Sequence, residues 1–66
     1  MADLIPITLE EEIICLRREI GMRQSVYPRW VASGKMKLDR AEREIAVMKS
    51  ALERLCRLRD TPLEGA

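Results

Sequence analysis

The chain has 66 residues, of which 47% are hydrophobic and 35% are charged, and its formal net charge is +1. A chain this short forms at most one domain and buries only about 60% of the surface that its unfolded form exposes, so its stability is marginal. Two cysteines without any histidine are too few for a disulfide scaffold or a zinc site. With no base to activate a nucleophile, we expect no enzyme, no catalytic residue, no metal, no cofactor and no small-molecule substrate.

Charge is distributed unevenly along the chain. Residues 1–16 contain four acidic and no basic residues, residues 17–43 contain eight basic and three acidic residues, and residues 44–66 contain four of each. The basic segment 17–43 suits nucleic-acid phosphates or an acidic protein. No DNA-reading motif matches it, so a nucleic-acid-binding accessory protein is the alternative hypothesis rather than the first.

The first helix is predicted to begin at Leu9. Thr8 and Glu11 have the spacing of a capping box, in which each side chain bonds the backbone amide of the other residue. The apolar seam that follows has heptad spacing and one polar interruption, at Arg23. This arginine is expected to extend its charged head to the edge of the seam, or else to set register or reach a partner. The seam comprises Leu9, Ile13, Leu16, Ile20, Arg23, Tyr27 and Trp30.

Pro28 lies inside this pattern, where it removes one helical hydrogen bond. We predict one helix over about residues 9–33 with a bend near Pro28, and a break at residues 25–27 as the alternative. Gly34 is expected to end the helix in a left-handed conformation.

A second helix is predicted over about residues 38–59. Asp39 and Glu42 either form a second capping box or simply lie in the first turn, and Pro62 ends the element. Its seam has heptad spacing without a polar interruption and consists of Leu38, Ala41, Ile45, Met48, Leu52 and Leu55. The remaining segments, 1–7 and 60–66, are expected to be extended tails.

The short connection makes the two helices antiparallel neighbours, so the fold class is an all-α, coiled-coil-like hairpin in a single domain, residues 1–66. Facing positions have residue numbers that sum to about 71, which places Trp30 opposite Ala41 and Cys15 level with Cys56. We expect these two cysteines to be reduced thiols, with a disulfide as the less favoured alternative. The predicted hairpin core is Ile13, Leu16, Ile20, Ile45, Met48, Leu52 and Leu55.

One hairpin leaves part of the wide apolar stripe of the first helix uncovered, including Ile14, Met22 and Val26. A second copy would cover it in a symmetric four-helix bundle, so a homodimer is predicted. Cover by another protein is the alternative. No segment has the roughly 20 apolar residues that a membrane span needs, and no targeting signal is recognisable, so we expect a cytoplasmic protein without membrane contact.

Residues 26–36 contain the only Trp and the only Tyr of the chain, beside several basic residues. In a structural interpretation the two rings close the end of the hairpin core. In a functional one, they form a basic aromatic surface for a partner. The candidate partner-binding residues are Arg23, Tyr27, Arg29, Trp30, Lys35, Lys37 and Arg40.

The run VYPRWVASGKM from Val26 to Met36, followed by EIAVM from Glu44 to Met48, resembles a group of short bacteriophage and prophage proteins of proteobacteria. The resemblance covers about residues 16–48. It implies a phage origin and a role inside the bacterial host cell, and it transfers no functional residue. Together with the composition, it favours a small helical protein that modulates or inhibits a host protein, or serves as an adaptor.

Overall fold

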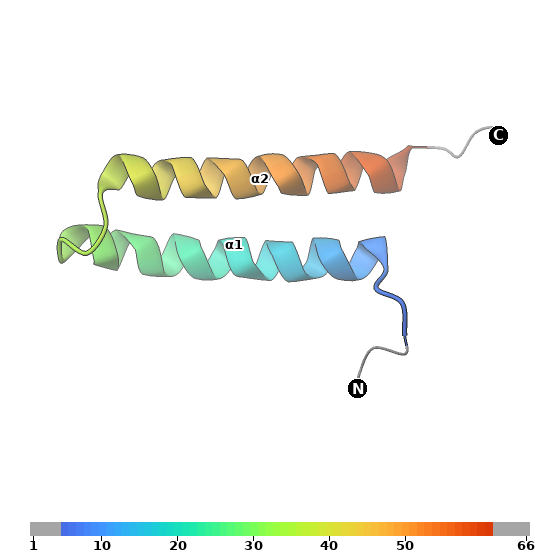
Figure 1. Ribbon diagram of the computed structural model, residues 1–66, viewed down its shortest axis with the longest axis horizontal. Coiled ribbons are helices and arrows are strands. Elements are labelled where there is room, and N and C mark those ends of the chain that lie inside the picture. The colour runs from blue at the N-terminus through green and yellow to red at the C-terminus, as the bar shows by residue number, and fades with distance from the viewer. Residues whose placement is uncertain (1–4, 62–66) are drawn as a thin grey trace.

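The computed structural model describes residues 5–61, which form two antiparallel α-helices (Figure 1). Helix α1 runs over Leu9–Ala32 and helix α2 over Leu38–Asp60. The predicted all-α hairpin is therefore confirmed, and the described range contains no strand. Residues 1–4 and 62–66, which belong to the two predicted tails, lie outside the described residues. Neither helix offers a stretch long and apolar enough to pass through a membrane.

The capping box at the start of α1 forms as predicted. The backbone N–H of Glu11 donates to Thr8 Oγ1 at 3.1 Å, and the backbone N–H of Thr8 donates to Glu11 Oε1 at 3.0 Å. Glu10, Glu11 and Glu12 occupy the first turn, where the helix dipole favours negative charge. These contacts explain why α1 begins at Leu9.

Pro28 lies within α1, which continues through it to Ala32. The alternative prediction of a break at residues 25–27 is therefore wrong, while the bend near Pro28 stays a prediction. Because proline has no N–H, the carbonyl of Gln24 loses its usual donor one turn later.

Gly34 ends α1 as predicted, with a left-handed φ of 83°. Its backbone N–H donates to the Val31 carbonyl at 3.1 Å, and the Lys35 N–H donates to the Trp30 carbonyl at 2.8 Å. This pair of bonds is the Schellman motif, which satisfies carbonyls that the helix end would otherwise leave without donors. The chain can then reverse within a few residues.

Helix α2 begins without a side-chain cap, because its N-cap residue is Lys37. The predicted capping box of Asp39 with Glu42 does not form. Asp39 lies in the first turn of α2, which is the alternative prediction for this residue. At the other end, the hydroxyl of Thr61 donates to the Arg57 carbonyl at 2.6 Å.

The core is a narrow line between the two helices. Its buried residues are Ile13, Ile20 and Tyr27, which recur every seven residues along α1, together with Ala41 from α2. The other predicted core residues are half-buried, namely Leu16, Ile45, Met48, Leu52 and Leu55. A single layer of two helices thus buries one stripe on each helix and leaves both broad sides of the hairpin open.

Two predicted seam residues lie outside this core. Trp30 keeps 44% of its surface exposed, and Leu38 keeps 59%. Ala41, the predicted partner of Trp30, instead lines a surface hollow together with Val31, and Trp30 does not line that hollow. The heptad pattern placed Trp30 on the seam, but α1 turns about 100° per residue, so near its end Val31 lies closer to the line of Ile20 and Tyr27.

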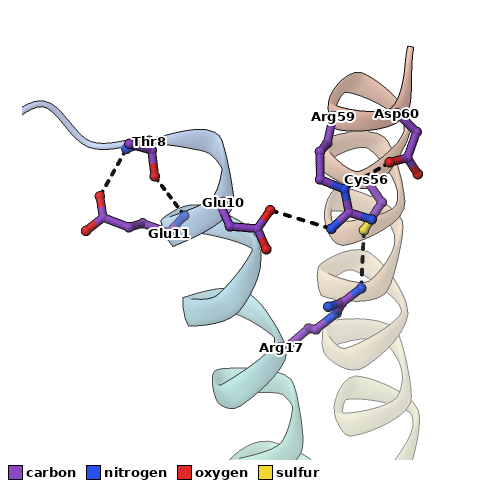
Figure 2. Close-up of polar contacts among 7 residues, drawn as sticks. All are labelled: Thr8, Glu10, Glu11, Arg17, Cys56, Arg59 and Asp60. Atoms are coloured by element: carbon purple, nitrogen blue, oxygen red, sulfur yellow. Dashed lines mark hydrogen bonds and ion pairs between the residues drawn. The ribbon is translucent and has the colours of Figure 1, made fainter. Parts of the chain in front are cut away.

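Two contacts between the helices at the open end, where α1 starts and α2 ends, show the register of the hairpin (Figure 2). Arg17 donates to the sulfur of Cys56 at 3.7 Å, and Arg59 lies 3.7 Å from Glu10. These pairs have residue numbers that sum to 73 and 69, on either side of the predicted 71. Cys15 and Cys56 are both free thiols.

Candidate functional site

Three hollows follow one another along one broad side of the hairpin. The acidic hollow at the open end is lined by Ile7, Cys15, Leu16, Leu55, Glu11, Glu12 and Glu19. The central hollow is lined by Glu19, Met22, Arg23, Val26, Tyr27 and Trp30. The tip hollow at the turn end is lined by Trp30, Lys35, Met36, Lys37 and Arg40. Because Glu19 and Trp30 each belong to two of these hollows, the three form one continuous surface, which we call the Trp30 face.

The tip hollow combines apolar and cationic groups. It has a volume of about 400 Å³, and its walls include the half-exposed ring of Trp30 and the side chain of Met36. Lys35 and Lys37 are exposed, while Arg40 makes a loose ion pair with Glu44 at 3.6 Å. Such a mixture binds partners that bring an apolar side chain together with negative charge.

The two aromatic rings have different environments. Tyr27 is buried in the hairpin core, and its ring centroid lies 5.8 Å from that of Trp30. Trp30 projects from the core onto the Trp30 face. The burial of Tyr27 agrees with the structural interpretation of residues 26–36, whereas the exposed ring of Trp30 leaves the functional interpretation open for this residue.

Arg23 is satisfied within its own helix. Its Nη1 lies 2.6 Å from Glu19 Oε1 and also donates to the Glu19 backbone carbonyl at 3.2 Å. The hydrogen bond with Glu19 is the main reason that the pKa of Arg23 lies above its ordinary value. This charge on the seam is thus neutralised in place, and about a third of each side chain stays exposed.

Arg29 is the one candidate residue that lies away from the Trp30 face. It is exposed in the last turn of α1 and lines none of the three hollows. Helical geometry points it away from α2, since it follows the buried Tyr27 by two positions. The structure therefore brings together Trp30, Lys35, Lys37 and Arg40, with Arg23 and Tyr27 in the adjacent central hollow.

The acidic hollow was not predicted from the sequence. It has a volume of about 630 Å³ and joins carboxylates of α1 to Leu55 of α2. The excess of acidic residues over residues 1–16 was the available signal. What the sequence did not show was that these carboxylates and the tip lie on the same broad side.

A fourth hollow lies on the other broad side of the hairpin. It has a volume of about 390 Å³ and is bounded by Gln24, Pro28, Val31, Leu38, Ala41 and Ile45. Gln24 and Pro28 lie on the opposite side of the Ile20–Tyr27 line from Arg23 and Trp30, as 100° per residue requires. The exposure of Leu38 is explained by this position, because Leu38 lines an open hollow on the broad side instead of packing between the helices.

The described residues offer no group of three metal-binding side chains. Several of their carboxylates make ion pairs along the helices, as in the pair of Glu53 and Arg57 at 3.4 Å. The Trp30 face presents exposed apolar and charged side chains, which are groups that can contact another macromolecule. Comparison of the chain with protein families, with curated proteins and with solved structures finds no match.

Proposed function

We propose that this protein acts by binding another protein through its tip hollow. The observation that carries the proposal is the exposed ring of Trp30, which stands beside Met36 and three basic side chains. Tryptophan, methionine and arginine are enriched in protein interfaces, and one aromatic anchor often supplies much of the binding free energy. The surface that fits is acidic and carries a side chain large enough to pack on the indole ring.

The resemblance of residues 16–48 to phage and prophage proteins supports placing this contact inside a bacterial cell during infection. A small phage-type protein there modulates or inhibits a host protein, or serves as an adaptor between proteins. The capped, continuous α1 and the short turn support such a role, because Trp30 and Arg40 lie on regular helices and the other tip residues lie in the short connection between them.

We further propose that the hairpin works as a homodimer that forms a four-helix bundle. Large apolar side chains on both helices support this, since Met22, Val47 and Leu58 are all more than half exposed. Burying side chains of this size contributes about 1.5–3 kcal/mol each when the burial is complete. Light scattering on the purified protein tests the proposal, and a mass of one chain at micromolar concentration would contradict it.

The test of the tip is capture of proteins from a host lysate by the immobilised protein and by three variants. Trp30→Ala and Lys35→Glu alter the tip hollow, while Arg29→Glu reverses a charge outside it. We expect the first two variants to lose the captured protein and the Arg29 variant to retain it, with the helical circular dichroism of all three unchanged. Equal capture by all variants would contradict the proposal.

Binding to a short DNA duplex distinguishes the nucleic-acid alternative. A phosphate-binding surface would lose affinity steeply with added salt and would need the cations rather than the indole ring. Duplex binding that survives Trp30→Ala but fails with Lys35→Glu would favour that alternative. Absence of duplex binding at low salt would remove it.

A further inference from the structure

The two ends of the Trp30 face carry opposite charge. The tip hollow at the turn end contains Lys35 and Lys37, and the acidic hollow at the open end contains Glu11 and Glu12. Helix α1 has 24 residues, so these ends lie roughly 36 Å apart along one straight side. Each hollow also has apolar walls. Each therefore offers the other an apolar surface together with the opposite charge.

The central hollow of the same face carries no net charge, because its one acidic and its one basic residue bind each other. Arg23 is held by Glu19 at 2.6 Å. Around this pair the central hollow presents apolar side chains, among them Met22. A copy of this surface can therefore face it without like charges meeting at the centre.

We propose that the acidic surface bound by the tip is the open end of a second copy of this chain. The two hairpins stack through their Trp30 faces with their turn ends pointing in opposite directions. The tip hollow of each copy then lies over the acidic hollow of the other, and the same contact occurs twice around a twofold axis. This inference rests on the proposed protein-binding role of the tip and on the proposed homodimer, and it specifies their geometry; a host protein would then reach the tip by displacing the second copy.

Charge selects the opposite orientation over the parallel one. If both turn ends lay at the same end of the dimer, Lys35 and Lys37 would face their own copies. Glu11 and Glu12 would likewise meet their own copies at the open end. Like charges placed directly opposite each other disfavour association, whereas the opposite orientation converts both encounters into attraction.

The area of the face is sufficient for a stable dimer. Two helices side by side, each about 10 Å wide and about 36 Å long, present roughly 700 Å² per copy. Stacking two copies buries roughly 1,400 Å², within the range of specific interfaces. The hollow beside Pro28 stays on the outside of such a dimer, because it lies on the other broad side.

Charge reversal at each end tests the proposal by sedimentation equilibrium of the full chain. Lys37→Glu alters the tip hollow, Glu12→Lys alters the acidic hollow, and Lys49→Glu is a matched reversal at an exposed site that lines neither hollow. We expect the first two variants to raise the dimer dissociation constant about tenfold or more at low salt, and the Lys49 variant to leave it within about twofold. Each end variant changes two symmetric contacts, which is why a single substitution has so large an effect.

Mixing the variants decides the orientation. In the proposed dimer, Lys37→Glu and Glu12→Lys chains together restore both attractive contacts, so the mixture forms a heterodimer about as tight as the wild-type homodimer. Mixing Lys37→Glu with wild type separates the two orientations. In the proposed dimer this mixed dimer is weaker than the wild-type homodimer, because one tip then meets like charge at Glu12. In a parallel dimer it would be tighter, because the substituted tip would face Lys37 of the other copy, and that result would overturn the proposal. Dimerisation that is unaffected by Met22→Asp, in the central hollow, would also overturn it.

The outcomes separate this inference from the proposed function. A monomeric protein that still captures a host protein through Trp30 would overturn the second-copy proposal and leave the protein-binding role of the tip intact. A dimer that dissociates with Leu38→Asp, on the other broad side, but not with Met22→Asp would leave the homodimer intact and refute the Trp30 face as its interface.

Discussion

Replacement of Ile13 by alanine tests whether this side chain belongs to the hairpin core, and the adjacent, exposed Ile14 provides the comparison. Ile13 is fully buried at 0% exposure, whereas the adjacent Ile14 keeps 54% of its surface exposed. Deleting a buried isoleucine side chain to alanine costs about 2–5 kcal/mol, because apolar contacts are lost and a cavity is left. At about 0.05–0.15 kcal/mol per residue, a chain of 66 residues has a total stability of roughly 3–10 kcal/mol. We therefore expect Ile13→Ala to remove a large part of the stability.

Ile14→Ala is the matched control, since it makes the same chemical change one residue later. Part of the cost at this exposed site is offset by the higher helix propensity of alanine, so we expect a change within about 1 kcal/mol. Thermal unfolding followed by far-ultraviolet circular dichroism, at one fixed protein concentration, measures both variants. A loss of 2 kcal/mol lowers the melting temperature of so small a domain by roughly 8–16 °C. If Ile14→Ala destabilised the protein as much as Ile13→Ala, the assignment of the core would be wrong.

Three further predictions concern the helix ends, and urea unfolding measures each of them. Thr8→Ala should cost about 1 kcal/mol, and adding Glu11→Ala should cost much less than a second such amount, because the two residues form one capping box; additive losses would contradict this. Gly34→Ala should destabilise the protein by about 1 kcal/mol, because Gly34 has a φ of 83°. Gly21→Ala inside α1, with open space at its Cβ position, should stabilise it by up to about 1 kcal/mol. If both substitutions changed the free energy of unfolding in the same direction, the reasoning would be refuted. Lys37→Ser should stabilise by about 1 kcal/mol, because it supplies the side-chain cap that α2 lacks; no change would show that this end is already satisfied.

The features that could be predicted from the sequence are those set by short-range geometry. The bonds between Thr8 and Glu11 need only residues three apart, and the reversal at Gly34 needs only a residue without a Cβ atom. The heptad period and the short turn then determined an antiparallel register within a few residue numbers. The contact of Arg17 with Cys56 agrees with that register.

The features that the sequence did not predict depend on which side of the seam a residue faces. Trp30 follows the heptad spacing of the seam, yet it emerges on the broad side, because the drift between 3.5 and 3.6 residues per turn accumulates along α1. The same drift brings Val31 toward Ala41. Leu38 also follows the spacing, but it faces the hollow beside Pro28 on the other broad side and therefore stays exposed. Spacing alone therefore identified the stripe and not its edges.

Folding and binding are coupled in a hairpin of this shape. Its shortest dimension is 13 Å, about the diameter of one helix, so whatever covers a broad side also completes the burial of both helices. A residue whose removal weakens the contact will usually weaken the fold as well, which makes loss of binding ambiguous on its own. Lys37 escapes this ambiguity, because a glutamate there favours the N-terminus of α2 through the helix dipole while it opposes the acidic surface that the tip would bind. A substitution that stabilises α2 and still dissociates the complex acts through the contact itself.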